Sequence, residues 1–369
     1  MINKIFLLTL QLFVFLSSLN FIGHVKGSVG DHLSYYRKCL TDCLSSNCSN
    51  QEELEKFWTN QPVHLNLTLW SCEEECKYQC QWSTIDFLLV ELELERNLLP
   101  QFHGKWTFYR FFGIQEPASA LFSLLNLVTT YLAWTRYAKR ILQESPSDDL
   151  DKGFTVGNIV DPYFKVTTIG AILSMNAWLW STVFHSRDTL LTERLDYFSA
   201  FSTVLFSFYA IVVRMIDEHL DLPGKRSTIH TSLLLPFISY YLYHVYYLIF
   251  VQFDYAFNMK ANLVAGFSSS LLWLIWAYKR LATIPMSQLK DHHIVKCVIS
   301  ILLVNCLLIF EINDFPPIYF ILDAHSIWHF GTICLPFLWF SFLEKEALEG
   351  QAKKKPERES SSKTKLHCN

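Results

Sequence analysis

Residues 294–312 read IVKCVISILLVNCLLIFEI, an apolar stretch whose only charged residues are Lys296 and Glu311. A membrane-spanning helix needs roughly 20 predominantly apolar residues, so this stretch is long enough to cross a bilayer. Similar stretches occupy 117–135, 163–185, 195–215, 231–252, 261–279 and 324–343. The sequence therefore predicts an all-α membrane protein built on a seven-transmembrane helix bundle.

The composition of the whole chain agrees with this fold class. Of its 369 residues, 51% are hydrophobic and 16% aromatic, whereas only 18% are charged. The basic residues lie scattered in short loops and a tail rather than in a patch interleaved with aromatic residues. This pattern excludes nucleic acid as an expected partner.

The first residues have the features of a secretory signal peptide. A positive start at Lys4 precedes an apolar run at 5–16 that is too short to span a membrane comfortably, and a cleavage site fits near Gly27. We expect residues 1–27 to be removed as a signal peptide. The alternative is an uncleaved anchor helix.

Residues 28–105 form a polar segment rich in cysteine. Its six cysteines are Cys39, Cys43, Cys48, Cys72, Cys76 and Cys80. Behind a signal peptide they predict three disulfides in a small N-terminal disulfide-rich luminal domain, with a zinc site as the less favoured alternative. Six cysteines allow 15 pairings, and the sequence leaves that choice open. Four further cysteines are expected to be free: Cys297, Cys306, Cys334 and Cys368.

Two glycosylation sequons, at Asn47 and Asn66, fit the same luminal segment. Asn47 is expected to be the poorer acceptor, because its sequon contains Cys48, a candidate for a disulfide.

Charges in the loops predict the orientation of the bundle. The loops after the first, third and fifth spans carry eleven basic residues, and those after the second, fourth and sixth carry three. Basic loops stay in the cytosol, so the N-terminal domain should be luminal. The residues 345–369 then form a cytosolic tail, predicted to be disordered because it is rich in Lys, Glu and Ser. The seven spans lie between these two segments, in a transmembrane domain predicted at 106–344.

Two fragments place ionisable residues at the luminal rim of this bundle. Ser181 and His185 share a face at the end of the second span, and Asp196 opens the third. His325 and His329, in the sequence HSIWH, share a face at the start of the seventh. Any one of these histidines alone would be an ordinary interface residue. Their convergence predicts a metal hydrolase site, because ionisable groups at membrane depth are costly.

Each residue of this set has an expected role. His185, His325 and His329 would bind Zn2+, leaving an open position at which the pKa of a water falls to about 7. Asp196 would accept the proton of that water or orient a histidine. Ser181 would donate to a developing oxyanion. It is less suited to be a nucleophile, since no histidine remains as its base, and a hydroxyl that only packs between helices is the third alternative.

The sequence also resembles a known group of membrane hydrolases. Ser-x3-His, an Asp eleven residues later and a late His-x3-His are typical of the CREST superfamily, which includes the alkaline ceramidases and the progestin and adiponectin receptors. Within it the chain is most similar to the post-GPI attachment to proteins factor 3 family. The stretches that carry this resemblance are the early Cys-x3-Cys cluster, GKWTFYR at 104–110, GIQEPAS at 113–119, NAWLWS at 176–181 and FHSRD at 184–188.

The resemblance implies a lipase of the secretory pathway that acts on GPI-anchored proteins in the Golgi membrane or, alternatively, the endoplasmic reticulum. Such enzymes remove the unsaturated sn-2 acyl chain of the anchor before reacylation with a saturated chain. The spacing of the residues supports only a site at the luminal rim that is accessible to membrane lipids. Two other hypotheses stay open: a ceramidase-like lipid amidase, and a non-catalytic receptor or folding factor with a structural metal.

Overall fold

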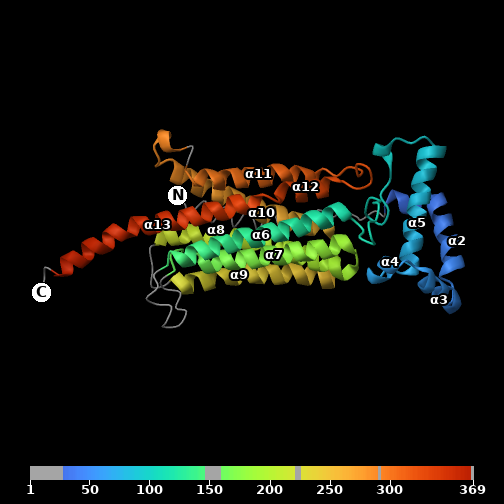
Figure 1. Ribbon diagram of the computed structural model, residues 1–369, viewed down its shortest axis with the longest axis horizontal. Helices are drawn as coiled ribbons and strands as arrows, with labels where there is room; N and C mark the ends of the chain where they lie inside the picture. Colours follow the sequence, from blue (N-terminus) through green and yellow to red (C-terminus); the bar gives the residue numbers. More distant parts are fainter. Residues whose placement is uncertain (1–27, 146–158, 221–225, 290–291, 367–369) are drawn as a thin grey trace.

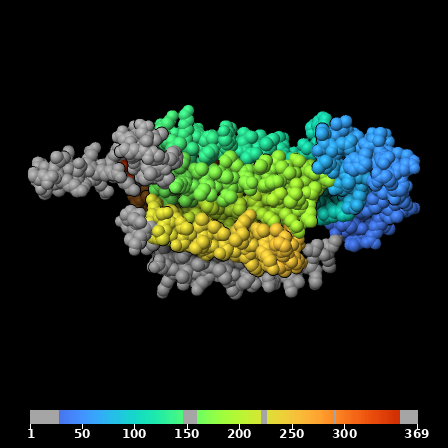
Figure 2. Space-filling view, turned by 90° about the horizontal axis from the view of Figure 1, so that it is seen from below, coloured from blue at the N-terminus to red at the C-terminus, as the bar shows by residue number. Residues whose placement is uncertain are grey.

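The computed structural model describes residues 28–145, 159–220, 226–289 and 292–366, so the predicted signal peptide lies outside the described residues. The molecule is elongated, with a bundle of long helices and a separate block of shorter helices at one end (Figures 1 and 2). We call this block, residues 28–116, the cap. The described residues contain helices and isolated β-bridges but no strand, in agreement with the all-α prediction.

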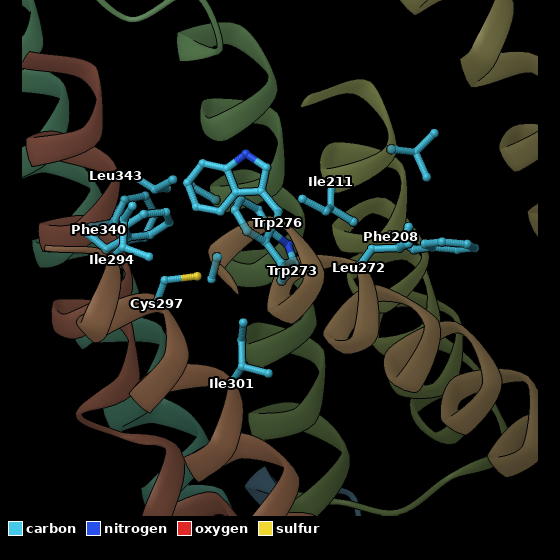
Figure 3. Close-up of a cluster of buried hydrophobic side chains, with 14 of the residues drawn as sticks. Phe208, Ile211, Leu272, Trp273, Trp276, Ile294, Cys297, Ile301, Phe340 and Leu343 are labelled. Carbon is cyan, nitrogen blue, oxygen red and sulfur yellow. The ribbon is translucent and has the colours of Figure 1, made fainter. Parts of the chain in front are cut away.

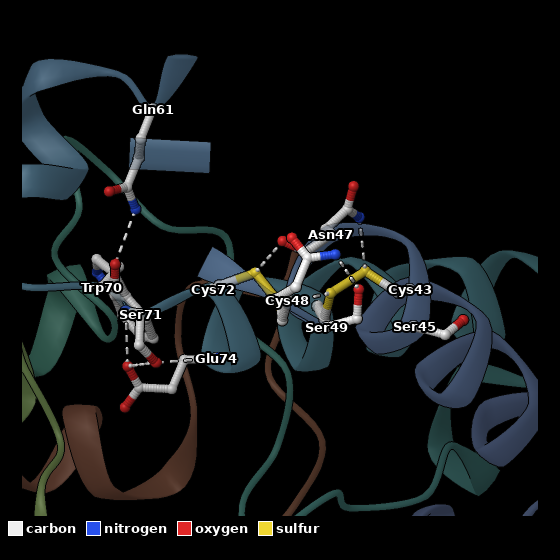
Figure 4. Close-up of a disulfide and its surroundings, with 12 residues drawn as sticks. Cys43, Ser45, Asn47, Cys48, Ser49, Gln61, Trp70, Ser71, Cys72 and Glu74 are labelled. Atoms are coloured by element: carbon white, nitrogen blue, oxygen red, sulfur yellow. Dashed lines mark hydrogen bonds between the residues drawn. A yellow bond between two sulfur atoms is a disulfide. The ribbon is translucent and has the colours of Figure 1, made fainter. Parts of the chain in front are cut away.

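The cap is organised around two helices joined by disulfides. Its elements are η1 (Val29–His32), α2 (Ser34–Asn47), α3 (Gln51–Asn60), α4 (Val63–Leu67), α5 (Cys72–Asp86), η2 (Phe87–Glu91) and η3 (Arg96–Leu98). The disulfides are Cys39–Cys80, Cys43–Cys76 and Cys48–Cys72. The first two link α2 to α5, and the third links the residue that follows α2 to the start of α5 (Figure 4). Cysteines four residues apart share one face of a helix, as Cys39 and Cys43 do on α2 and Cys72, Cys76 and Cys80 do on α5, while Cys48 follows the end of α2. The cysteines of the two segments therefore pair in antiparallel order. The three predicted disulfides are confirmed, and the alternative of a cysteine zinc site is wrong.

Polar contacts complete the cap. Ser71 and Glu74 form a capping box at the start of α5, which satisfies backbone donors that a helix leaves unpaired (Figure 4). A small apolar core lies beneath the disulfides, where Tyr36, Ile85 and Phe102 are almost fully buried.

The two predicted glycosylation sites differ in exposure. Asn47 is exposed at the end of α2, and Cys48 is disulfide-bonded, as the sequence predicted. Asn66 is half-buried in α4, and its Nδ2 donates to the Gln61 backbone oxygen at 3.4 Å.

The bundle consists of long helices that run side by side (Figure 1). They are α6 (Pro117–Gln143), α7 (Phe164–Ser186), α8 (Leu190–Leu220), α9 (Arg226–Tyr246) continued by η7 (Tyr247–Val251), α10 (Tyr255–Leu281), α11 (Ile294–Ile312), α12 (Ala324–Thr332) and α13 (Leu335–Leu366), with η8 (Met286–Gln288) in a loop. Within the described parts of the chain, six segments are long and apolar enough to cross a membrane, α12 and α13 together making one of them.

The prediction of seven spans is therefore not met in full. The missing one is α7, which lies between α6 and α8 but contains Asn176, Ser181 and His185 among its apolar residues. Its length suffices for a span. It also carries two of the predicted site residues, Ser181 and His185, near its C-terminus.

The prediction for the C-terminal tail also differs from the structure. The helix α13 continues to Leu366, whereas the sequence predicted disorder from 345. Ala347 is buried, and Glu346 accepts from His293 Nε2 at 2.8 Å and pairs with Arg280 at 3.3 Å. Lys, Glu, Ala and Gln are good helix formers, so a charged composition does not by itself end a helix. The bundle extends past the predicted boundary at 344.

Apolar side chains from several helices interlock in the middle of the bundle. Trp273 and Trp276 of α10 pack against Phe342 of α13 with ring centroids 5.9 and 5.8 Å apart (Figure 3). Cys297 of α11 and Phe201 of α8 are fully buried in the same core. This core holds the helices rigidly and so fixes the ends that carry the polar residues.

Candidate metal centre and active site

Three imidazoles meet at the cap end of the bundle. His185 is near the C-terminus of α7, and His325 and His329 lie on the first turns of α12. The His185 Nε2 atom lies 3.3 Å from the Nε2 atoms of both His325 and His329, which are 2.9 Å from each other. The structure thus brings together all three histidines that the sequence singled out.

The local sequence explains how α12 presents two of them. Asp323 caps the helix by accepting from the backbone N–H of Ser326 at 2.8 Å, and the Ser326 hydroxyl lies 3.0 Å from the Asp323 N–H, from which it accepts. Both residues are buried, so the start of the helix is fixed in one place. The spacing of four residues then turns both imidazoles to the same side.

Two glutamates hold the outer nitrogens of the imidazoles. His185 Nδ1 lies 2.7 Å from Glu116 Oε2, and His325 Nδ1 lies 2.6 Å from Glu311 Oε2. A carboxylate that accepts the Nδ1 proton fixes the tautomer and leaves the Nε2 lone pair facing the centre. Sequence reasoning assigned no role to either glutamate. Glu116 stands in the GIQEPAS stretch, which offered a signal, whereas Glu311 looked like an ordinary charge at the end of a span.

Lys105 extends this network toward the cap. Its Nζ atom lies 2.7 Å from Glu116 Oε1 and 2.9 Å from Asp188 Oδ2. Burial alone would raise the pKa of Glu116, but Lys105 and His185 outweigh it and hold that pKa far below its usual range. Burial would lower the pKa of Lys105, but the charges of Glu116 and Asp188 raise it above its usual value. Glu116 is therefore ionised, as an acceptor for His185 must be.

Asp196 lies close to the histidines without touching them. It opens the second turn of α8 and interacts electrostatically with His185 and His325. No hydrogen bond within the described residues joins its carboxylate to an imidazole. The electrostatic interactions place the Asp196 carboxylate near His185 and His325.

Ser181 lies one turn below His185 and is buried. Its hydroxyl lies 3.0 Å from that of Ser123 on α6, a residue that sequence reasoning missed. Near it, Asn126 Nδ2 donates to the backbone oxygen of His329 at 2.8 Å and so links α6 to α12. The Ser181 hydroxyl can either donate to a ligand or only pack between helices. In the second case Ser123 is its hydrogen-bond partner.

The donor set fits a tetrahedral zinc ion. Zinc–nitrogen bonds of about 2.0–2.1 Å place two ligand nitrogens about 3.3 Å apart. The three Nε2 separations of 2.9–3.3 Å match this spacing. Three lone pairs that face one another repel, and a cation between them removes that repulsion. The buried His329 Nδ1 has no hydrogen-bond partner in the described part of the chain.

Comparisons with known proteins show the family of this chain. The sequence pattern of the Per1-like family matches residues 62–347, which include all the residues described above except those of the early cap. A Danio rerio protein named GPI-specific phospholipase A2-like PGAP3 is 38% identical over 331 residues, 90% of this chain and 94% of its own. The Homo sapiens protein of that name is 38% identical over 323 residues, 88% and 90% of the two chains. A Drosophila melanogaster protein named post-GPI attachment to proteins factor 3 is 35% identical over 323 residues, 86% and 88% of the two chains. No solved structure matches the chain.

Proposed function

We propose, on the premise that this chain belongs to the Per1-like family, that it is a phospholipase A2-like acyl hydrolase that remodels GPI anchors. It would remove the unsaturated sn-2 fatty acid from GPI-anchored proteins at a luminal, metal-assisted site. The names of the relatives support the GPI lipid as substrate. The observation that carries the chemistry is the triangle of three Nε2 atoms, each within 3.3 Å of the other two.

The membrane setting supports a lipid as the substrate. The histidines lie where α7 ends and α12 begins, so the site is at one end of the bundle rather than deep within it. An ester bond near the headgroup of a phospholipid lies at this depth, because the acyl chains begin there. The three disulfides of the cap favour an oxidising lumen on the same side, in the Golgi or the endoplasmic reticulum.

Each residue of the site would have its own role in ester hydrolysis. Glu116 and Glu311 accept the Nδ1 protons of His185 and His325 and keep their Nε2 lone pairs available. A zinc ion held by His185, His325 and His329 would lower the pKa of a bound water to about 7 and so supply the nucleophile. The Asp196 carboxylate would accept a proton from the attacking water, and the Ser181 hydroxyl would donate to the carbonyl oxygen as it gains charge. The bond between the acyl carbon and the alcohol oxygen would then break, the fatty acid would leave, and the proton held by Asp196 would pass to the leaving oxygen, which becomes the hydroxyl of the lyso-lipid.

A cell experiment tests this proposal. Cells that lack the protein should keep an unsaturated chain on their GPI-anchored proteins, measured by mass spectrometry of released anchors. Re-expression of the wild type should restore saturated anchors, and Asp196→Asn at equal abundance should not. His219→Ala is a matched control, because His219 is exposed on the same helix α8 at the opposite end.

Two outcomes would contradict the proposal. Rescue by Asp196→Asn would favour a folding factor or receptor whose metal is structural. A rise in total ceramide with normal anchors would select a ceramidase-like lipid amidase.

A further inference from the structure

The turns at the cap end of the bundle present large apolar side chains on the surface. Leu69, Phe112 and Tyr319 lie at the tips of three different turns and are 76%, 68% and 73% exposed. All three have a left-handed backbone, with φ of 58°, 48° and 54°. In water an exposed patch of such residues is unfavourable, and it usually marks a surface that binds a partner.

The backbone at these tips makes chance exposure a poor explanation. The left-handed conformation is unfavourable for an ordinary residue, because its Cβ atom comes too close to the backbone, so glycine or asparagine usually occupies it. Here Leu69, Phe112 and Tyr319 occupy it instead, without the hydrogen bonds that an asparagine side chain would add. An energetic cost of this kind is compensated if the exposed side chain is buried in something else.

Two of the three tips belong to one surface. The hairpin that contains Phe112 packs on α4, because Trp70 Nε1 donates to the Gly113 backbone oxygen at 2.9 Å. A Cβ atom on Gly113 would lie only 2.4 Å from Thr68 Oγ1, so the two turns are in close contact. We call the exposed apolar residues of this surface the cap lip. They are Val63, Leu67, Leu69, Phe111 and Phe112, and each is at least 63% exposed.

The cap lip lies at the level where the spanning helices end. Arg187, which follows α7, donates to the backbone oxygens of Thr68 and Leu69 at 3.1 and 3.2 Å. The next helix, α8, then begins with Leu190 and Leu191, which are 58% and 66% exposed. In Figure 1, α4 lies at the edge of the cap that faces the end of α7. The cap lip is thus continuous with the surface that the bundle turns toward lipid.

A second exposed apolar turn lies beside the site, in the loop between α11 and α12. The loop between α11 and α12 exposes Ile318, Tyr319 and Ile321, by 48%, 73% and 41%. It is tied to the cap because the Tyr109 N–H donates to the Phe320 backbone oxygen at 2.9 Å. The same loop leads directly into α12 and its two histidines.

From these contacts we infer that the cap lip and the Ile318, Tyr319 and Ile321 tip insert into the leaflet of the membrane on the cap side. The occupant of this apolar surface is the acyl-chain region of phospholipids. Aromatic and aliphatic residues at helix ends settle at this depth in membrane proteins. Insertion of both apolar surfaces holds the cap at a fixed depth relative to the membrane. A lipid then enters the histidine site from the leaflet rather than from water. The inference concerns the position of the cap and holds whatever reaction the site performs.

The experiment measures depth with a fluorophore on the full-length protein in nanodiscs. Cys306, Cys334 and Cys368 are replaced by serine, and the environment-sensitive dye NBD is attached at Leu69→Cys, Phe112→Cys or Tyr319→Cys. Lys56→Cys, on exposed α3, is the matched control. We expect a blue-shifted emission at the three tips and at least twofold stronger quenching by lipids with a nitroxide high on the acyl chain than at Lys56→Cys.

Two results would overturn the inference. Quenching at the tips no stronger than at Lys56→Cys would place them in water. A blue shift without quenching would mean that protein covers them, either a second copy or another partner, and light scattering of the same sample separates those two cases. Circular dichroism and the three intact disulfides check that each variant is folded.

Discussion

The cap and the bundle are stabilised by opposite means. The cap combines three disulfides with ion pairs and a guanidinium, that of Arg110, which lies 3.4 Å from the Trp70 ring centroid and 3.6 Å from that of Tyr78. The bundle relies on interlocked apolar side chains such as Trp273 and Phe342. A segment as small as the cap cannot bury enough apolar surface, so covalent links replace a core. Lipid tails are as apolar as helix surfaces, so the bundle depends on close packing instead.

The site lies where the two modes of stabilisation meet. Glu116 ends the cap, and its backbone N–H donates to the His185 oxygen at 2.9 Å. Its carboxylate joins Lys105 of the cap to His185 of the bundle. A polar centre at this junction can be both positioned by rigid helices and accessible from the membrane surface. Because the cap and the bundle are stabilised by different interactions, a destabilising substitution in one should leave the other folded.

The largest effect is expected from a cavity in the bundle. Trp276→Ala removes a side chain that is 2% exposed, and such substitutions cost about 3–5 kcal/mol. The apparent melting temperature of the bundle in detergent should fall, whether or not the disulfides are reduced. Trp58→Ala, at an exposed position in the cap, is the control and should change little. An equal loss in the two variants would show that burial does not govern the stability of the bundle.

The next largest effect belongs to the cap. Cys39→Ser with Cys80→Ser removes the disulfide at the C-terminal half of α5, and losses of this kind cost about 2–5 kcal/mol. Limited proteolysis should cut residues 28–116 faster while the bundle keeps its melting temperature. Cys306→Ser is the control, since Cys306 is free. Simultaneous unfolding of cap and bundle would contradict the independence of the two regions.

Much of the bundle and the site could be predicted, because apolar length and the spacing of four residues are local properties. His185, His325 and His329 were found in this way. The cysteine pairing was not, since spacing gives the face of each helix but not the order in which two faces meet. Glu116 and Glu311 were not predicted, because each matters only through a contact between the ends of two helices, with His185 and His325, which lie 69 and 14 residues away. The sequence also predicted α7 as a span, but α7 is not among the six described segments that are long and apolar enough to cross a membrane.

A smaller effect is expected at the junction, from the partner of a histidine. Glu311→Gln leaves His325 without an anionic acceptor, and changes of this kind lower metal affinity by about 10–100-fold. Zinc affinity, measured by competition with a chelator on the purified protein, should fall by that factor. Glu349→Gln is the control, because Glu349 pairs with His293 at the other end of the bundle. Equal zinc affinity in wild type and Glu311→Gln would show that Glu311 does not support metal binding by His325.

The smallest effect concerns the ion pair between the cap and the end of α7. Burial alone would raise the pKa of Glu74, but hydrogen bonds from Arg187 and Ser71 lower it below its usual value. A carboxylate with a lowered pKa in the folded state stabilises the fold above its unfolded pKa of about 4.3, and this contribution is lost as the pH falls through the folded value. The Glu74 and Arg187 side chains are 31% and 14% exposed, so the loss should not exceed about 1 kcal/mol.

Acidification from pH 5 to pH 3 should therefore lower the protection against hydrogen exchange, after correction for the intrinsic pH dependence of exchange, where the cap meets the bundle around Thr68 and Leu69. In Glu74→Gln this dependence on pH should flatten, because an amide does not titrate in that range. Glu52→Gln, in an exposed pair with Lys56 on α3, is the control and should keep the wild-type profile at these positions. A profile in Glu74→Gln as steep as that of the wild type would mean that other carboxylates hold the cap to the bundle in acid.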